Sequence, residues 1–308
     1  MKVTALAGGV GAAKLVSGLA ALVPARDLSV IVNTGDDFGW MGLYICPDLD
    51  TIIYTLAGLA HPVNGWGLAA DSFHCLERMR LLGCDTWFRI GDRDLATHIF
   101  RTQRLHEGQR LSEVTAAVCS RSGVHVRVLP MTDSPVPTHV DTDRGTLDFQ
   151  EYFVRLQCTP RIFAVFYSGV DRATAPPPVL EAIGEADAVI LCPSNPWLSI
   201  GPILAVPGIR ESLRATRAKT LAVSPIVAGK ALKGPAAAMM SQLGLEVSAA
   251  GVAGLYRDFL DIFVMDGRDQ LLRGQVAALG LEARIAETIM DTPASRVSLA
   301  HALLEILG

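Results

Sequence analysis

The stretch that decides the fold is Val3-Thr4-Ala5-Leu6-Ala7-Gly8-Gly9-Val10-Gly11-Ala12-Ala13-Lys14-Leu15. It begins as an apolar segment typical of a short strand, passes through three glycines within four residues, and continues with leucines spaced as on one face of a helix. A strand, a glycine turn and a helix together aim backbone N–H groups and the helix N-terminus at an anion, usually a phosphate. The same pattern also fits a tight turn that binds nothing. We predict a phosphate-binding loop, with the plain turn as the alternative.

This loop matches neither of the common nucleotide fingerprints. A Walker loop requires Gly-x-x-x-x-Gly-Lys-Ser/Thr, and the dinucleotide fingerprint requires a third glycine where this chain has Lys14. The sequence therefore indicates an anion site of another kind.

The composition limits the class of protein. A chain of 308 residues, half of them hydrophobic, can bury one large α/β core. No apolar run reaches membrane-spanning length and the N-terminus enters a strand directly, so we expect a soluble, cytoplasmic protein. The net charge of −4 gives no reason to expect a nucleic acid partner. The six cysteines lack Cys-x-x-Cys spacing, and we expect buried free thiols.

The other apolar runs predict the remaining sheet. Leu28-Ser29-Val30-Ile31-Val32 is β-branched without alternation, which is typical of a parallel strand covered on both faces. Similar segments occur at 124–129, 188–191 and 220–223. We predict a single α/β domain over 1–308 with a doubly wound, mostly parallel, Rossmann-like sheet. A largely helical insertion is expected at about 50–123, a β-hairpin from 136–140 and 146–149, and a terminal helix at 294–307.

Polar side chains recur where the predicted strands end, which is the edge at which parallel sheets bind ligands. They are Asp36, Asp37, Asp48, Asp50, Asp92, Asp94, Asp133, Ser194 and Asn195. Each aspartate alone could be a helix cap or a turn former. Together they would repel a bound polyanion unless a divalent cation lay between, and Mg²⁺ suits carboxylates combined with phosphate oxygens. The arrangement suggests phosphoryl chemistry.

A set of motifs, in order along the chain, resembles one known family. The motifs are Ala7-Gly8-Gly9-Val10-Gly11-Ala12-Ala13-Lys14, Asn33-Thr34-Gly35-Asp36-Asp37, Pro47-Asp48-Leu49-Asp50-Thr51, Gly91-Asp92-Arg93-Asp94, Leu129-Pro130-Met131-Thr132-Asp133, Pro193-Ser194-Asn195-Pro196 and Val223-Ser224-Pro225-Ile226. Together they resemble the CofD/FbiA family, the 2-phospho-L-lactate transferases of coenzyme F420 biosynthesis. The resemblance runs from Lys2 to about Asp269.

The resemblance implies a reaction with two substrates. The acceptor would be Fo, the deazaflavin 7,8-didemethyl-8-hydroxy-5-deazariboflavin. The donor would be a guanosine diphosphate ester that carries lactate or enolpyruvate. The terminal ribityl hydroxyl of Fo would attack the distal phosphorus with help from Mg²⁺, and GMP would leave. Both three-carbon acids are compatible with these motifs, and the apolar helices are compatible with a homodimer.

The resemblance also assigns expected roles to residues. Catalysis is expected from Asp50 and Asp37, and metal ligation from Asp37 and Asp48. The donor and its phosphates are expected at Gly8, Gly9, Val10, Gly11, Lys14, Asn33, Ser194 and Asn195. Fo is expected at Asp50, Arg89, Asp92, Met131 and Asp133.

Two other functions are compatible with parts of the sequence. The glycine loop and the Asn33–Asp37 run also resemble the YvcK-type proteins, which bind nucleotide sugars and act as regulators, but Gly91–Asp94 and Met131–Asp133 favour the transferase. A nicotinamide oxidoreductase would need the missing third glycine and an acidic ribose-binding residue after the second strand.

Overall fold

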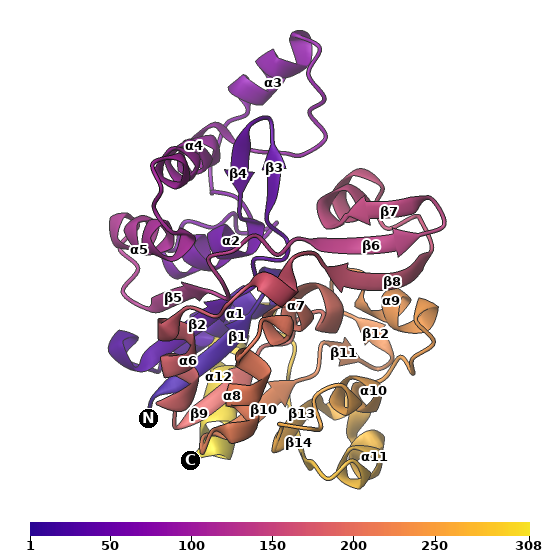
Figure 1. The fold of residues 1–308 in the computed structure, drawn as a ribbon. Coiled ribbons are helices and arrows are strands. Elements are labelled where there is room, and N and C mark those ends of the chain that lie inside the picture. Colours follow the sequence, from indigo (N-terminus) through magenta and orange to yellow (C-terminus); the bar gives the residue numbers. More distant parts are fainter.

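A seven-stranded parallel sheet runs through the centre of the computed structural model, which describes residues 1–308 (Figure 1). Its strands are β1 (Val3–Ala7), β2 (Leu28–Val32), β5 (Arg127–Pro130), β9 (Ala188–Leu191), β10 (Lys219–Val223), β13 (Ile262–Asp266) and β14 (Glu282–Ala286). Their order across the sheet is β14-β13-β10-β9-β1-β2-β5, and every neighbouring pair is parallel. The predicted doubly wound α/β fold is confirmed.

The strand order creates a switch point beside the N-terminal strand. β1 pairs with β2 on one side and with β9 on the other, so the chain builds the sheet outward in both directions from β1. At such a point the loops after the two central strands diverge to opposite faces and leave a crevice between them. The glycine loop that follows β1 therefore lies at the expected place for a ligand.

Two hydrophobic cores cover the two faces of the sheet. Alternate side chains of β1 point to opposite faces, so Val3, Ala5 and Ala7 join one core whereas Leu6 joins the other. The first core is covered by α1 (Gly9–Ala20), α2 (Pro47–Leu56), α5 (Leu111–Arg121) and α12 (Pro293–Leu307). The second is covered by α6 (Pro177–Gly184), α7 (Gly201–Ala205), α8 (Ile209–Ala215), α9 (Ala236–Gln242), α10 (Ala249–Gly254) and α11 (Arg273–Ala278).

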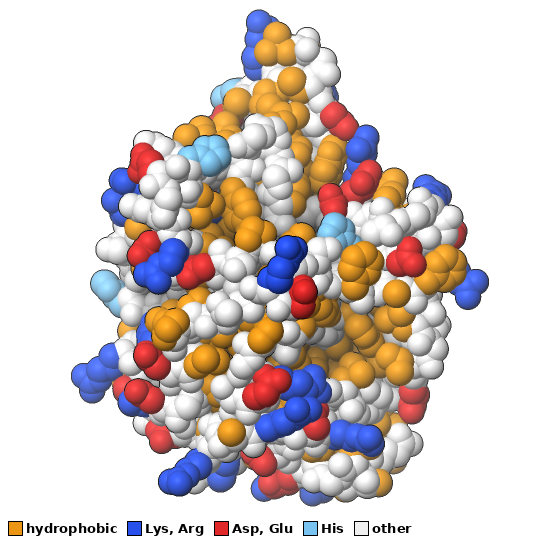
Figure 2. Space-filling model, viewed as in Figure 1, with side chains coloured by type: hydrophobic (Ala, Val, Ile, Leu, Met, Phe, Trp, Pro, Cys, Tyr) orange, Lys and Arg blue, Asp and Glu red, His pale blue; other side chains and the backbone are white.

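Within the segment predicted as a helical insertion, about 50–123, α2 and α5 pack on the sheet. What projects from the body is α3 (His74–Leu81), with α4 (Asp92–His106) at its base (Figure 1). A hairpin of β3 (Phe38–Trp40) and β4 (Leu43–Ile45) supports it and was missed from the sequence, because strands of three residues are too short to show a period. Trp40, Phe88 and their neighbours form a small apolar core there, and Figure 2 shows hydrophobic side chains gathered on this part of the surface.

A separate antiparallel sheet lies beside the main one. The predicted hairpin is confirmed as β6 (Thr138–Thr142) and β7 (Gly145–Asp148), and β8 (Ile162–Tyr167) adds a third strand. A short hairpin, β11 (Ile226–Val227) and β12 (Lys230–Ala231), follows β10.

Two further features of the structure concern membrane spans and the burial of the cysteines. No helix in the structure has both the length and the apolar character needed to cross a bilayer. Of the cysteines expected to be buried, Cys46, Cys119 and Cys192 are, Cys158 is partly buried, and Cys75 and Cys84 are exposed on and after α3.

One close helix contact can be tested directly. A Cβ on Gly18 of α1 would collide with the carbonyl oxygen of Arg296 in α12. We expect Gly18→Ala to lower the free energy of unfolding by about 1–3 kcal/mol, as overpacking does. Gly274→Ala in α11 is the matched control, because nothing lies within 4 Å of its added Cβ. Chemical denaturation of both variants checks this, and equal stabilities would contradict the packing described.

Candidate functional site

Asn33 forms the centre of the site at the switch point. It follows β2, is completely buried, and its Nδ2 donates to Asp36 Oδ1 at 2.9 Å, to Asp48 Oδ2 at 2.9 Å and to the carbonyl of Leu198 at 3.0 Å. Its Oδ1 accepts from the backbone N–H of Gly35 at 2.8 Å. One amide thus ties the loop after β2 to the start of α2 and to the segment after β9.

The glycine loop is held from both sides by polar contacts. Gly9 N donates to Asp48 Oδ1 at 2.8 Å, and Ser194 Oγ donates to the carbonyl of Gly8 at 2.8 Å. A Cβ on Gly8 would lie 2.6 Å from Ser199 Cβ, and Gly9 has a φ of +74°, so larger residues do not fit this turn. One N–H that the sequence assigned to a phosphate therefore already binds a carboxylate.

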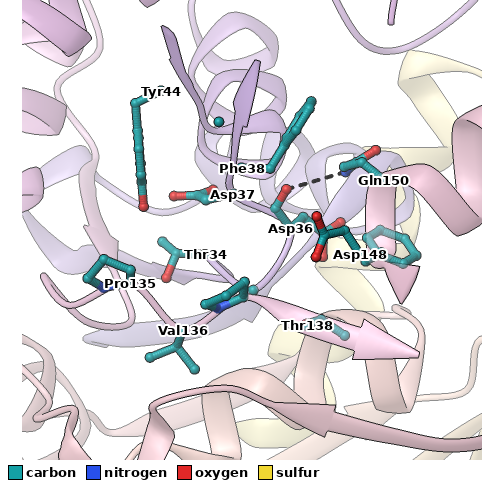
Figure 3. Close-up of a pocket in the computed structure, with 14 residues that line it drawn as sticks. Thr34, Asp36, Asp37, Phe38, Tyr44, Pro135, Val136, Thr138, Asp148 and Gln150 are labelled. Atoms are coloured by element: carbon teal, nitrogen blue, oxygen red, sulfur yellow. Dashed lines mark hydrogen bonds between the residues drawn. The ribbon is translucent and has the colours of Figure 1, made fainter. Parts of the chain in front are cut away.

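A cavity of about 240 Å³ opens beside the loop after β2 (Figure 3). It is lined by Thr34, Gly35, Asp36, Asp37, Phe38, Gly39, Tyr44, Pro135, Val136, Pro137, Thr138, Asp148, Phe149 and Gln150. Both carboxylate oxygens of Asp37 are buried without a hydrogen-bond partner, and so are the hydroxyls of Thr34 and Thr138. Buried polar atoms are normally paired, so this concentration of unpaired acceptors indicates a place for a ligand with donors or positive charge.

The carboxylates are buried together, and this shifts their protonation. Burial raises the pKa of Asp37 well above its usual value. Burial, reinforced by the charge of Asp48, does the same to the pKa of Asp36. Burial also raises the pKa of Asp48 to about 6, although its bonds from Asn33 and Gly9 oppose the rise. A bound cation would reverse these shifts by favouring the ionised forms.

A second polar group lies behind the first. Asp50, one turn into α2, is bound by both terminal nitrogens of Arg101 in α4, with Nη1 to Oδ2 at 3.1 Å. Arg101 Nη1 also lies 3.1 Å from His98 Nδ1, and His98 Nε2 lies 3.4 Å from Asp94 Oδ1. The ligand atoms of Asp50, Asp94 and His98 lie within 4.8 Å of one another, so this group could hold a metal ion. In the structure the guanidinium of Arg101 already supplies the positive charge there.

Several predicted site residues have structural partners within the protein. Asp92 accepts hydrogen bonds from Ser72 Oγ and from the first N–H groups of α3, and Asp133 accepts from Ser112 N at the start of α5. Met131 is buried in the second core. Asp92 and Asp133 thus accept hydrogen bonds at the starts of helices, and Met131 packs in the core.

The remaining predicted residues lie in three different surroundings. Asn195 Oδ1 accepts from Trp197 N at 2.9 Å and so begins the helical turn at 196–200. Arg89 is exposed, with its guanidinium 4.6 Å from the centre of the Phe73 ring. Lys14 is half-buried in α1, and burial followed by the charge of Lys233 lowers its pKa.

Comparison with known proteins places the chain in a family. The family model described as 2-phospho-L-lactate transferase CofD matches residues 3–289. The chain belongs to the CofD family. A 2-phospho-L-lactate transferase of Methanosarcina acetivorans is 41% identical over 296 residues, which are 96% of each chain. A phosphoenolpyruvate transferase of Streptomyces coelicolor is 42% identical over 312 residues, covering 99% of this chain and 98% of that one.

A solved structure confirms the fold of this CofD-family chain. A member of the UPF0052 family from Bacillus halodurans superposes with a TM-score of 0.64 and covers 98% of both chains at 16% identity. At that identity the likeness concerns the fold alone. The transferase relatives, in contrast, match this chain from end to end at 41% and 42% identity.

Sequence reasoning missed Arg101 and Tyr44 and did not recognise the cavity. Arg101 lies three residues after His98, a spacing that puts both on one face of a helix, and this signal was available. Tyr44 gave no such signal, because its place at the cavity depends on the unrecognised β3–β4 hairpin.

The raised pKa of Asp48 gives a pH-dependent prediction. Because its folded pKa lies above its unfolded value, the protonated carboxyl stabilises the fold below about pH 4, and this contribution is lost as the pH rises through about 6. The free energy of unfolding of the wild type should therefore fall relative to Asp48→Asn between pH 4 and 7, by up to about 3 kcal/mol. Urea unfolding at several pH values checks this, and a constant difference would contradict it.

Proposed function

We propose that the protein transfers a phospholactyl or phosphoenolpyruvyl group from a guanosine diphosphate ester to the ribityl hydroxyl of Fo and releases GMP. One observation carries the proposal. Asp37 is a buried carboxylate without a hydrogen-bond partner, and it lines a cavity beside the switch point of a chain whose relatives are transferases.

The donor is proposed to bind across the crevice between β1 and β9. Gly8, Gly9, Val10 and Gly11 would offer backbone N–H groups at the start of α1, where the helix dipole favours an anion. Because Gly9 N donates to Asp48, the diphosphate and this carboxylate would compete for the same donor unless a cation lies between them. Asn33, Ser194 and Asn195 are proposed on the guanosine side, and Lys14 as an added charge for the phosphates.

A magnesium ion is proposed at Asp37 and Asp48. Asp37 suits this role, because its two oxygens have no hydrogen-bond partner and can accept a hard cation. Asp48 belongs to the same group of buried carboxylates, and it accepts hydrogen bonds from Gly9 N and Asn33 Nδ2. When bound, the ion would neutralise the diphosphate charge and favour departure of GMP.

The cavity is proposed as the site of Fo. Phe38, Tyr44 and Phe149 supply aromatic walls for a flat ring system, and the unpaired acceptors suit the hydroxyls of a ribityl chain. Asp37 would accept the proton of the attacking hydroxyl, an effect worth roughly 10²–10⁴-fold. Asp50 is held by hydrogen bonds from both terminal nitrogens of Arg101. The other proposed Fo-side residues are Arg89, Asp92, Met131 and Asp133.

Incubation of the protein with Fo, Mg²⁺ and each guanylated three-carbon acid, followed by mass analysis, tests the proposal. A phosphodiester of Fo together with GMP is the expected product. A protein that only binds nucleotide sugars would give no product and would not bind Fo, and that outcome would overturn the proposal.

Asp37→Asn should separate activity from stability. The amide removes the proton acceptor and a metal ligand, so transfer should fall by roughly 10²–10⁴-fold. Because the ionised carboxylate is buried and unpaired, its removal should leave the free energy of unfolding at pH 7 unchanged or higher.

Glu305→Gln is the matched control, since it makes the same chemical change on the exposed face of α12. Steady-state rates and urea unfolding of both variants check the prediction. If Asp37→Asn loses activity only in proportion to lost folding, the assigned role is wrong.

A further inference from the structure

Arg101 is the one Lys or Arg side chain that the fold buries. Only 2% of its surface is exposed, in the middle of α4. A guanidinium in such a place is stable only if it is paired, and replacing its partner leaves an uncompensated charge. Asp50 is that partner, through a bidentate contact that lysine cannot reproduce.

The pair fixes the start of α2. This helix has no side-chain cap, since Cys46 stands at its N-cap position. Its first turn is held instead by two carboxylates, one on each side: Asp48 binds Gly9 N and Asn33, and Asp50 binds Arg101. Asp48 and Asp50 lie in one turn of α2, so this turn links the glycine loop to Arg101 in α4.

The surroundings of Arg101 restrict its own movement. Its Nη1 also donates to His98 Nδ1, which leaves the His98 Nε2 proton directed toward Asp94 Oδ1. Tyr54 OH donates to the same oxygen of Asp94 at 2.8 Å, and this tyrosine belongs to α2. Two polar contacts, Asp50 with Arg101 and Tyr54 with Asp94, therefore connect α2 to α4. Every side chain in this network has a polar partner, which is what fixed positioning of the two helices requires.

We propose that Arg101 is a positioning residue for the transfer reaction: through Asp50 it fixes the first turn of α2, and so holds Asp48 and the glycine loop in register with the cavity. The inference rests on the proposed function. It predicts that Arg101 acts on turnover through Asp50, in addition to stabilising the fold.

A double-mutant cycle tests this with Arg101→Met, Asp50→Asn and the double variant. Arg101→Met should lower kcat by about 10²-fold, the size expected for misplaced reacting groups. It should also lower Tm, because Asp50 is left charged and buried. The double variant removes both charges, so its Tm should recover, whereas its kcat should stay as low as that of Asp50→Asn. Arg101→Lys should keep more of the kcat than Arg101→Met, since the charge remains without the fork.

Arg104→Met is the matched control on the same helix, because Arg104 makes only a surface pair with Glu107. It should change neither kcat nor Tm appreciably. Recovery of kcat together with Tm in the double variant would overturn the proposal, because Arg101 would then act on stability alone. The proposal would also be overturned if kcat of the double variant fell by the product of the two reductions seen in the single variants.

A readout that needs no activity separates this inference from the proposed function. The backbone amide resonance of Gly9 reports its hydrogen bond to Asp48. In two-dimensional NMR spectra it should move in Arg101→Met and in the double variant, and stay in place in Arg104→Met. An unmoved Gly9 resonance would overturn the positioning role even if the wild type proved inactive with Fo. A moved resonance with an inactive wild type would uphold the positioning role and count against the proposed function.

Discussion

The burial of several carboxylates at one edge of the sheet is the constraint on which the rest of the site depends. Asp36, Asp37, Asp48 and Asp50 are all buried, and Arg101 is the one buried Lys or Arg side chain available to balance them. Like charges in a poorly solvated place repel each other, so the fold has to restrain them. It does so with the amide of Asn33, the N–H of Gly9 and the fork of Arg101, and it leaves the carboxylate oxygens of Asp37 without a hydrogen-bond partner.

The strand order explains why these groups meet. β1, β2 and β9 are neighbours, and their carboxyl ends deliver the glycine loop, the Asn33–Asp37 run and Ser194 to one crevice. Residues separated by as many as 186 positions, such as Gly8 and Ser194, are then in hydrogen-bond contact. The site is a consequence of the doubly wound topology, and the Gly9–Asp48 hydrogen bond links the start of α1 to the start of α2.

Much of this could be predicted from the sequence, because β1, β2, β9 and β10 are largely apolar runs and the glycine turn has a distinct composition. Asn33, Asp48 and Ser194 were expected near the glycine loop, and the structure brings them there. The helix-capping roles of Asp92 and Asp133 were not distinguishable from ligand binding, since an aspartate in a loop suits both. β8 was missed because its apolar run shows no alternation of buried and exposed side chains, and the β3–β4 hairpin because strands of three residues are too short to show a period. For the same reason the cavity, with Tyr44 on its wall, could not be foreseen.

Calorimetric titration of Mg²⁺ in the presence of GDP, at pH 6 and in two buffers of different ionisation enthalpy, is the most direct test of the account. The central claim is that the carboxyl of Asp37, which has no hydrogen-bond partner and whose pKa is raised by burial, receives the cation. The wild type should bind Mg²⁺ with release of a proton beyond that of the protein-free titration, and Asp37→Asn should bind it more weakly without that release. Equal affinity and equal proton release in the two proteins would contradict the account.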